Sequence, residues 1–178
     1  MARCWLGSLA VLLLLALGPT NGLAAMSMGG APITQTGKTA HFRLMLQIGP
    51  METMYSKADA AKMHPTTGEI MVGGAMAMSG GAMIGQTGAM TTDTRHLEVH
   101  VASLATGKVT TDATCQITVT NEATKASQVV PIAMMYGVKE GTSDWHYGNN
   151  VSMAPGSYTV KVVVNGEPAL FHVTIPKS

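Results

Sequence analysis

Apolar and polar residues alternate over several short stretches of this chain, as they do in β-strands with one buried face. The first stretch runs from 39 to 48 and places these apolar side chains on one face: Phe42, Leu44, Leu46 and Ile48. Further apolar or alternating stretches follow at 95–104, 114–120, 128–136, 158–164 and 169–175. Asn165-Gly166 opens the connection between the last two, which is a strong hairpin signal. The pattern predicts an all-β fold, an immunoglobulin-like antiparallel β-sandwich.

Three segments interrupt this pattern. Ser56 is placed to cap a short helix over 56–63, and the polar, glycine-containing residues from 139 to 150 predict a loop. Segment 71–90 differs from both, because its many glycines do not favour a regular helix or strand. We expect a flexible surface loop there, whose five methionines are poorly explained as core filler. Capture of a soft metal ion, sacrificial oxidation and plain compositional drift are the three interpretations.

The chain begins like a secretory signal peptide. Arg3 is the only early charge, residues 6–17 are almost entirely apolar, and Leu23-Ala24-Ala25 offers small residues to a peptidase. The apolar run is shorter than the about 20 residues that a membrane-spanning helix needs. We therefore expect residues 1–25 to be removed. Residues 26–178 would then form a single periplasmic or secreted domain without a membrane span, and an uncleaved anchor is the alternative.

Charge and cysteine content exclude several classes of protein. Once Arg3 is removed with the signal, ten basic side chains balance ten acidic ones, so nothing attracts nucleic acid or an anionic membrane. Cys4 lies in the signal, which leaves Cys115 without a partner for an internal disulfide. The sequence has no phosphate-binding loop, dinucleotide fingerprint or nucleophile elbow. We therefore expect a binding protein and not an enzyme.

Histidine and glutamate gather on one face of a predicted strand. Residues two apart on a strand share a face and lie roughly 7 Å apart, so His96, Glu98 and His100 present two imidazoles and a carboxylate together. Nitrogen and oxygen ligands of this kind suit divalent iron, copper, manganese or zinc. The alternative is a solvated polar face with ordinary surface histidines.

A second group of possible ligands follows later in the chain. Met134 and Met135 lie near the end of an apolar segment. His146 follows between Trp145 and Tyr147, which can hold its imidazole rigidly. A thioether nearby would add a soft ligand suited to Cu(I), and the chain has fifteen methionines against eight aromatic residues. The alternative is that these methionines only fill the core.

Three stretches of this sequence resemble the periplasmic ferrous-iron transport protein family, over residues 95–175. They are His96-Leu97-Glu98, His146-Tyr147-Gly148-Asn149-Asn150-Val151 and Pro155-Gly156-Ser157-Tyr158-Thr159-Val160. The resemblance implies an immunoglobulin-like sandwich that binds copper or a related divalent ion through histidines and methionine. It also implies a homodimer and, as a partner, a high-affinity iron permease of the inner membrane. The Gly/Met segment at 71–90 is not part of the family's pattern.

Carried over residue by residue, the family's metal ligands fall on His96, Glu98, His146 and Met135. Met134 is the alternative methionine, and His100 is a further candidate from the strand face. The resemblance predicts a site for one copper or iron ion and a role in iron acquisition. A periplasmic copper chaperone or resistance protein would use the same fold, with the Met-rich segment holding Cu(I). A structural or interaction sandwich without metal is the third interpretation.

Overall fold

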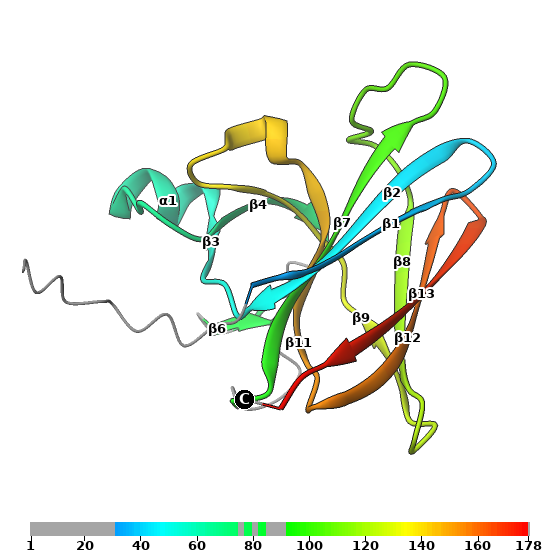
Figure 1. Cartoon of the computed structure of the whole chain (residues 1–178). Helices are drawn as coiled ribbons and strands as arrows, with labels where there is room; N and C mark the ends of the chain where they lie inside the picture. The colour runs from blue at the N-terminus through cyan, green and yellow to red at the C-terminus, as the bar shows by residue number, and fades with distance from the viewer. Residues whose placement is uncertain (1–30, 75–76, 80–81, 85–91, 178) are drawn as a thin grey trace, which may run out of the picture.

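Most of the chain forms two β-sheets packed face to face (Figure 1). The computed structural model describes residues 31–74, 77–79, 82–84 and 92–177, so the predicted signal peptide at 1–25 lies outside the described residues. The larger sheet has the strand order β1-β2-β7-β11-β10-β4-β3, and the smaller one has the order β13-β12-β8-β9. All neighbouring strands are antiparallel except β3 and β4, which pair in parallel over three residues. The predicted fold class, an all-β antiparallel sandwich, is confirmed.

The strands match the alternating stretches closely. The larger sheet contains β1 (Ile33–Lys38), β2 (Phe42–Pro50), β3 (Met54–Ser56), β4 (Glu69–Gly74), β7 (Thr94–Ser103), β10 (Ala133–Gly137) and β11 (His146–Ser152). The smaller sheet contains β8 (Cys115–Asn121), β9 (Ser127–Val130), β12 (Gly156–Val164) and β13 (Glu167–Ile175). β5 (Ala77–Ser79) and β6 (Ala82–Ile84) form a separate hairpin. A short 3-10 helix, η1 (Gly141–Asp144), precedes β11.

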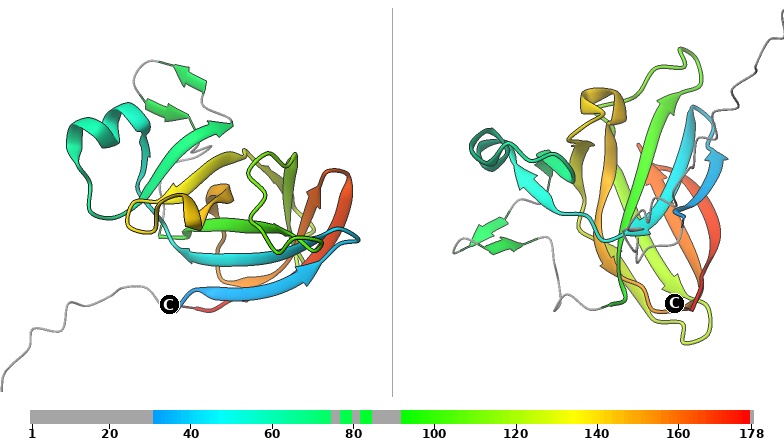
Figure 2. Two further views of the ribbon diagram at one scale, coloured as in Figure 1. Left: turned by 90° about the horizontal axis from the view of Figure 1, so that it is seen from above. Right: turned by 60° about the vertical axis from the view of Figure 1, so that its left-hand side comes forward.

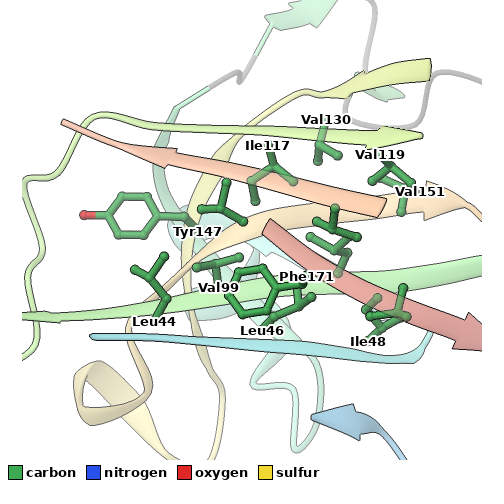
Figure 3. Close-up of a cluster of buried hydrophobic side chains, with 14 of the residues drawn as sticks. Leu44, Leu46, Ile48, Val99, Ile117, Val119, Val130, Tyr147, Val151 and Phe171 are labelled. Atoms are coloured by element: carbon green, nitrogen blue, oxygen red, sulfur yellow. The ribbon is translucent and has the colours of Figure 1, made fainter. Parts of the chain in front are cut away.

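The main core fills the space between the two sheets (Figure 3). Leu97, Val99 and Val101 of β7 are at most 1 % exposed, and they meet apolar side chains of the smaller sheet, including Ile117 and Val119. Burial of such side chains is the main stabilising term of a sandwich. Because side chains alternate across a strand, the same strand turns His96, Glu98 and His100 to the other face of the larger sheet.

Tyr147 fixes the orientation of β11 in the same way. Its ring is buried in the main core, while its hydroxyl accepts a hydrogen bond from the Ala113 N–H and donates one to the Thr110 carbonyl, both at 3.0 Å. These bonds tie the strand to the connection that leads from β7 to β8. With Tyr147 facing the core, His146 and Asn150 lie on the outer face of the sheet.

β4 and β3 form one edge of the larger sheet, and α1 (Lys57–Met63) follows β3 at that side, far from β13 (Figure 2). Ser56 caps α1 by accepting a hydrogen bond from the Asp59 N–H, so the predicted capped helix is confirmed. None of the helices in the described parts of the chain is long and apolar enough to cross a membrane.

The prediction of a flexible loop at 71–90 was wrong for its first four residues. Residues 71–74 belong to β4, and Met71 is only 7 % exposed in a second apolar cluster with Met54, Ala133 and Met135. β-pairing with β10 holds this segment in place despite its glycines. The rest of the segment contains the β5–β6 hairpin, and residues 75–76, 80–81 and 85–91 lie outside the described residues.

The predicted loop at 139–150 was also too long. η1 and then β11 occupy its second half, so His146 is the first residue of a strand and not a loop residue.

Cys115 is buried, and burial raises the pKa of its thiol to about 12, which leaves the thiol unreactive.

Candidate metal centre

β7 and β11 bring histidine and glutamate together on the outer face of the larger sheet. Asn150 pairs with His96, and Gly148 pairs with Glu98. A Cβ atom at Gly148 would lie 2.9 Å from the Glu98 Cα and would also strike the Leu97 carbonyl. Glycine at this position therefore allows β11 to approach β7 closely, which places His146 beside the Glu98 carboxylate.

The fourth member of the group, Glu69, comes from β4. β10 lies between β4 and β11, and Gly137 of β10 pairs with Glu69. Gly137 has no side chain, and a Cβ atom there would lie 2.5 Å from Glu140 Oε2 and 2.9 Å from Asp144 Oδ2, so glycine leaves room for carboxylates on this face. The distance from Glu69 Oε2 to His146 Nε2 is 3.4 Å.

Four ligand atoms converge at this point. One atom from each of Glu69, His96, Glu98 and His146 lies within 4.8 Å of the other three. Glu98 Oε2 lies 3.4 Å from His146 Nε2 and 3.6 Å from His96 Nε2. Two ligands that are each about 2.1 Å from a shared ion lie roughly 3–4 Å apart, so these spacings fit a single metal ion without large movements.

Three of these ligand atoms are buried without a hydrogen-bond partner among the described residues. They are Glu69 Oε2, His96 Nε2 and His146 Nε2, on side chains that are 7 %, 4 % and 0 % exposed. A buried polar atom without a partner costs about 1–3 kcal/mol, and such atoms in folded proteins require an explanation. A single cation at the point where they converge would satisfy all three.

Asn150 orients the His96 ring for this purpose. Its amide Nδ2 donates to the Glu52 carbonyl at 2.8 Å, and its Oδ1 accepts from the Glu52 N–H at 3.2 Å. These two backbone bonds determine which amide atom is the oxygen. The same Oδ1 lies 3.1 Å from His96 Nδ1, so Nδ1 carries the proton and donates it. The lone pair of a neutral His96 then lies on Nε2, which faces the centre.

The backbone of Asp144 orients the His146 ring in the same manner. His146 Nδ1 lies 2.7 Å from the Asp144 carbonyl oxygen, which can only accept a hydrogen bond. Nδ1 is therefore the donor, and the lone pair of a neutral His146 also lies on Nε2. Both imidazoles thus present a lone pair to the same point before any ion arrives.

Burial and mutual charge shift the acidities of these groups in different directions. Burial raises the pKa of Glu69 to about 7, although the nearby His96 opposes this effect. Burial also acts to raise the pKa of Glu98, but the nearby imidazoles of His100, His96 and His146 outweigh it, so the net pKa lies well below the usual range. The centre therefore holds one carboxylate that stays ionised, Glu98, and one whose pKa is close to neutral pH, Glu69.

The two histidine ligands differ as well. Burial acts to lower the pKa of His96, but the adjacent Glu98 carboxylate outweighs it, and the net pKa is raised. Burial lowers the pKa of His146, and the Glu98 charge only partly offsets this shift. His146 therefore stays neutral to lower pH than an exposed histidine, as a metal ligand must be.

His100 lies beside this group and not within it. Its Nε2 is 3.4 Å from Glu98 Oε1, whereas the other Glu98 oxygen faces His96 and His146. Its Nδ1 is 3.9 Å from Asp144 Oδ1, and ligand atoms of His100, Asp144 and His146 form a second group within 4.8 Å of one another. His100 thus orients the Glu98 carboxylate from the side away from the centre.

The two methionine candidates lie on opposite faces of the sheet. Met135 pairs with His146, shares its face, and is fully buried with Met54 and Met71 in the second apolar cluster. Met134 pairs with Tyr147 and packs against the main core, which places it on the face away from His146. Met134 is therefore not placed to bind an ion at this centre, whereas Met135 as a ligand stays a prediction.

Sequence reasoning missed three residues of this centre. Glu69 was assigned no role. Its spacing of two residues from Met71 at the start of β4 nevertheless indicated that the two side chains share one face of a strand. Asn150 and Asp144 act through an amide and a backbone carbonyl, which carry no ligand signature in sequence. The pairing of β4 with β10 brings Glu69 to the site from far along the chain.

The donor set defines the ions that this centre suits. Two imidazole nitrogens and two carboxylates favour a borderline divalent ion such as Fe(II), Mn(II), Zn(II) or Cu(II). The two carboxylates carry as much negative charge as such an ion carries positive charge. Neutralisation matters because an uncompensated charge is costly to bury.

Metal affinity should rise with pH and level off above about pH 7. The ion must displace the proton that Glu69 holds up to a pKa of about 7, and the proton that Glu98 helps His96 to retain. Calorimetric titrations in buffers of different ionisation enthalpy should show net proton release near pH 6.5. An affinity that does not change between about pH 5.5 and 8 would exclude these groups as ligands.

The similarity of this chain to known proteins is slight. No family model matches the chain, and no curated protein sequence matches it. A solved structure of FetP from uropathogenic E. coli strain F11 is similar, with 13 % sequence identity and a TM-score of 0.49. The match covers 82 % of this chain and 95 % of that chain.

Proposed function

We propose that this chain is an exported protein that binds one divalent transition-metal ion through Glu69, His96, Glu98 and His146. One observation carries the proposal: three buried ligand atoms without partners converge on a point that two pre-oriented imidazoles face. A centre of this kind costs stability in the metal-free protein, and an ion repays that cost. We propose a binding role and not catalysis.

We further propose that the bound ion is iron or copper and that the protein assists iron acquisition in the periplasm. The signal-like residues 1–25 support export. The resemblance of His96-Leu97-Glu98 and the run from His146 to Val151 to the periplasmic ferrous-iron transport family supports the iron-related role. An inner-membrane iron permease as partner and a homodimer belong to the same proposal.

Metal titration of the mature protein without a His tag tests the binding function. In equilibrium dialysis, the protein should bind about one ion per chain of Mn(II), Zn(II), Cu(II) or, in the absence of oxygen, Fe(II). An ion present at about 100 times its Kd adds about 2.7 kcal/mol to the free energy of unfolding, so the Tm should rise by several degrees. Substoichiometric loading with an unchanged Tm for all four ions would favour the interaction sandwich without metal.

A copper chaperone is the second candidate function, and the position of Met135 favours it. This side chain shares a face with His146 and lies against Met54 and Met71, so thioethers, which prefer Cu(I), adjoin the centre.

Met135→Leu keeps the volume and apolarity of the side chain but removes its sulfur. It should weaken Cu(I) binding by about tenfold or more and change Cu(II) binding less. Met134→Leu, on the opposite face, is the matched control. Competition titrations with a Cu(I) chelator measure the effect, and equal Cu(I) affinities for both variants would remove Met135 from the site.

A further inference from the structure

A cavity of about 470 Å³ leads from the surface to the candidate metal centre. Its lining includes the buried Glu69 and His96, and it also includes the exposed Lys139 and Glu140. The cavity therefore reaches three of the four residues of the centre, Glu69, His96 and Glu98. The cavity is far larger than a bare metal ion, so size alone does not select what enters.

The charge of the lining is strongly unequal. Five carboxylates line the cavity, and Lys139 is the one Lys or Arg among its lining residues. Glu69 and Glu98 belong to the centre and compensate the charge of a bound divalent ion. Glu52, Glu140 and Asp144 remain, and we call these three residues the acidic mouth.

Backbone contacts hold two members of the acidic mouth in place. Both backbone polar groups of Glu52 are bonded to the Asn150 amide, which also orients His96. Asp144 Oδ2 accepts a hydrogen bond from the Gly137 N–H at 3.2 Å, and its carbonyl orients His146. The acidic mouth is thus built on the same residues that orient the two imidazoles.

A cleft lined by one sign of charge, with protein walls of low dielectric, concentrates ions of the opposite sign and raises association rates by about 10- to 1000-fold. The acidic mouth therefore attracts a hydrated cation and repels a metal ion that arrives inside an anionic chelate, although the cavity has room for a small chelate.

We propose that the acidic mouth selects the form in which the metal arrives: the protein captures free hydrated divalent cations and discriminates against anionic metal chelates. This inference rests on the proposed function, because it names the substrate of that same centre. It assigns Glu52, Glu140 and Asp144 a role in the rate of capture, and it leaves the rate of release to the four ligands.

Stopped-flow association of Cu(II) with the mature protein tests the proposal. Trp145 directly precedes His146, so quenching of its fluorescence reports binding. The double variant Glu52→Gln/Glu140→Gln should lower the association rate constant by about 3- to 10-fold at low ionic strength. It should leave the dissociation rate nearly unchanged. Lys139→Glu should raise the association rate, and the differences should largely vanish near 0.5 M salt because the Debye length falls to a few ångströms.

Glu122→Gln is the control, since this exposed carboxylate lies beyond the end of β8 and pairs with His172, outside the cavity. A second measurement supplies Cu(II) as its anionic nitrilotriacetate complex. The wild type should bind copper from this complex more slowly than it binds the hydrated ion. In Glu52→Gln/Glu140→Gln, these two association rates should differ by a smaller factor.

Equal, salt-independent association rates for the wild type and all variants would overturn the acidic mouth but leave the centre intact. Absence of saturable binding in the wild type would instead overturn the proposed function itself.

Discussion

Replacing either His96 or His146 with alanine should weaken Cu(II) binding by about 100-fold or more. Loss of a residue that only supports a metal ligand typically costs 10- to 100-fold, and each of these imidazoles is placed as a ligand itself. The Nε2 atoms of both rings face the same carboxylate oxygen of Glu98, at 3.6 Å and 3.4 Å. Because one ion would use both rings, the double variant should lose less than the sum of the two single effects.

Competition titrations against a chromophoric copper chelator measure these affinities. His172→Ala is the matched control, because this histidine lies on β13 in the other sheet, is 71 % exposed and pairs with Glu122. It should bind Cu(II) as the wild type does. If His96→Ala and His146→Ala also bind as tightly as the wild type, the shared centre does not exist.

Glu69→Gln should have two large effects of opposite sign. It should weaken divalent metal binding by about tenfold or more, since a neutral amide is a poorer ligand and leaves one negative charge to balance the ion. It should also stabilise the metal-free protein above pH 7. The variant therefore separates the function of this side chain from its contribution to folding.

The sign of the stability effect follows from the raised pKa of Glu69, about 7 against 4.5 for the unperturbed group. The fold favours the protonated form, so its contribution is fully present below pH 4.5 and is lost as the pH rises through about 7. At pH 8 the ionised carboxylate destabilises the metal-free protein, by on the order of 1–3 kcal/mol. Glutamine removes that cost.

Denaturant unfolding of the metal-free wild type and Glu69→Gln at pH 4 and pH 8 measures this difference. The variant should gain stability at pH 8 and little or none at pH 4. Glu122→Gln, an exposed carboxylate, should show no such gain at pH 8. A loss of stability in Glu69→Gln at both pH values would show that Glu69 supports the fold and is not held there for a ligand.

Strands with one buried face were predictable because their side chains alternate in the sequence. β2, β7, β8, β12 and β13 all lie within a few residues of the predicted stretches. β11 was missed because it lies between β7 and β10 and is buried on both faces, so its polar residues His146, Asn149 and Asn150 break the alternation.

The stretch at 128–136 illustrates a different limit. It divides into β9 in the smaller sheet and β10 in the larger sheet, with Pro131 between them. Proline cannot donate a hydrogen bond to a β-ladder, which fits a chain that leaves one sheet at this point. The register shift between Met134 and Met135 follows at once, and sequence alone did not determine which methionine shares a face with His146.

Three of the four residues that converge at the centre, His96, Glu98 and His146, were candidates from the sequence, and Glu69 was not. His96 and Glu98 share a strand face by their spacing, which is a local property. Glu69 reaches the centre through the pairing of β4 with β10, and Asn150 acts through backbone bonds to Glu52. Such pairings depend on the order and register of strands that lie far apart in the chain, and the local pattern of a single sequence does not predict them.

Electron paramagnetic resonance of the mature protein loaded with one equivalent of Cu(II) shows whether His96 and His146 bind one ion together. Nitrogen couplings in such a spectrum count the imidazoles bound to the ion, whichever metal the protein carries in the cell. We expect two histidine nitrogens for the wild type and for His172→Ala, and one for His96→Ala and for His146→Ala. A wild-type spectrum without histidine nitrogens, or one that neither His96→Ala nor His146→Ala alters, would exclude a centre that the two histidines share.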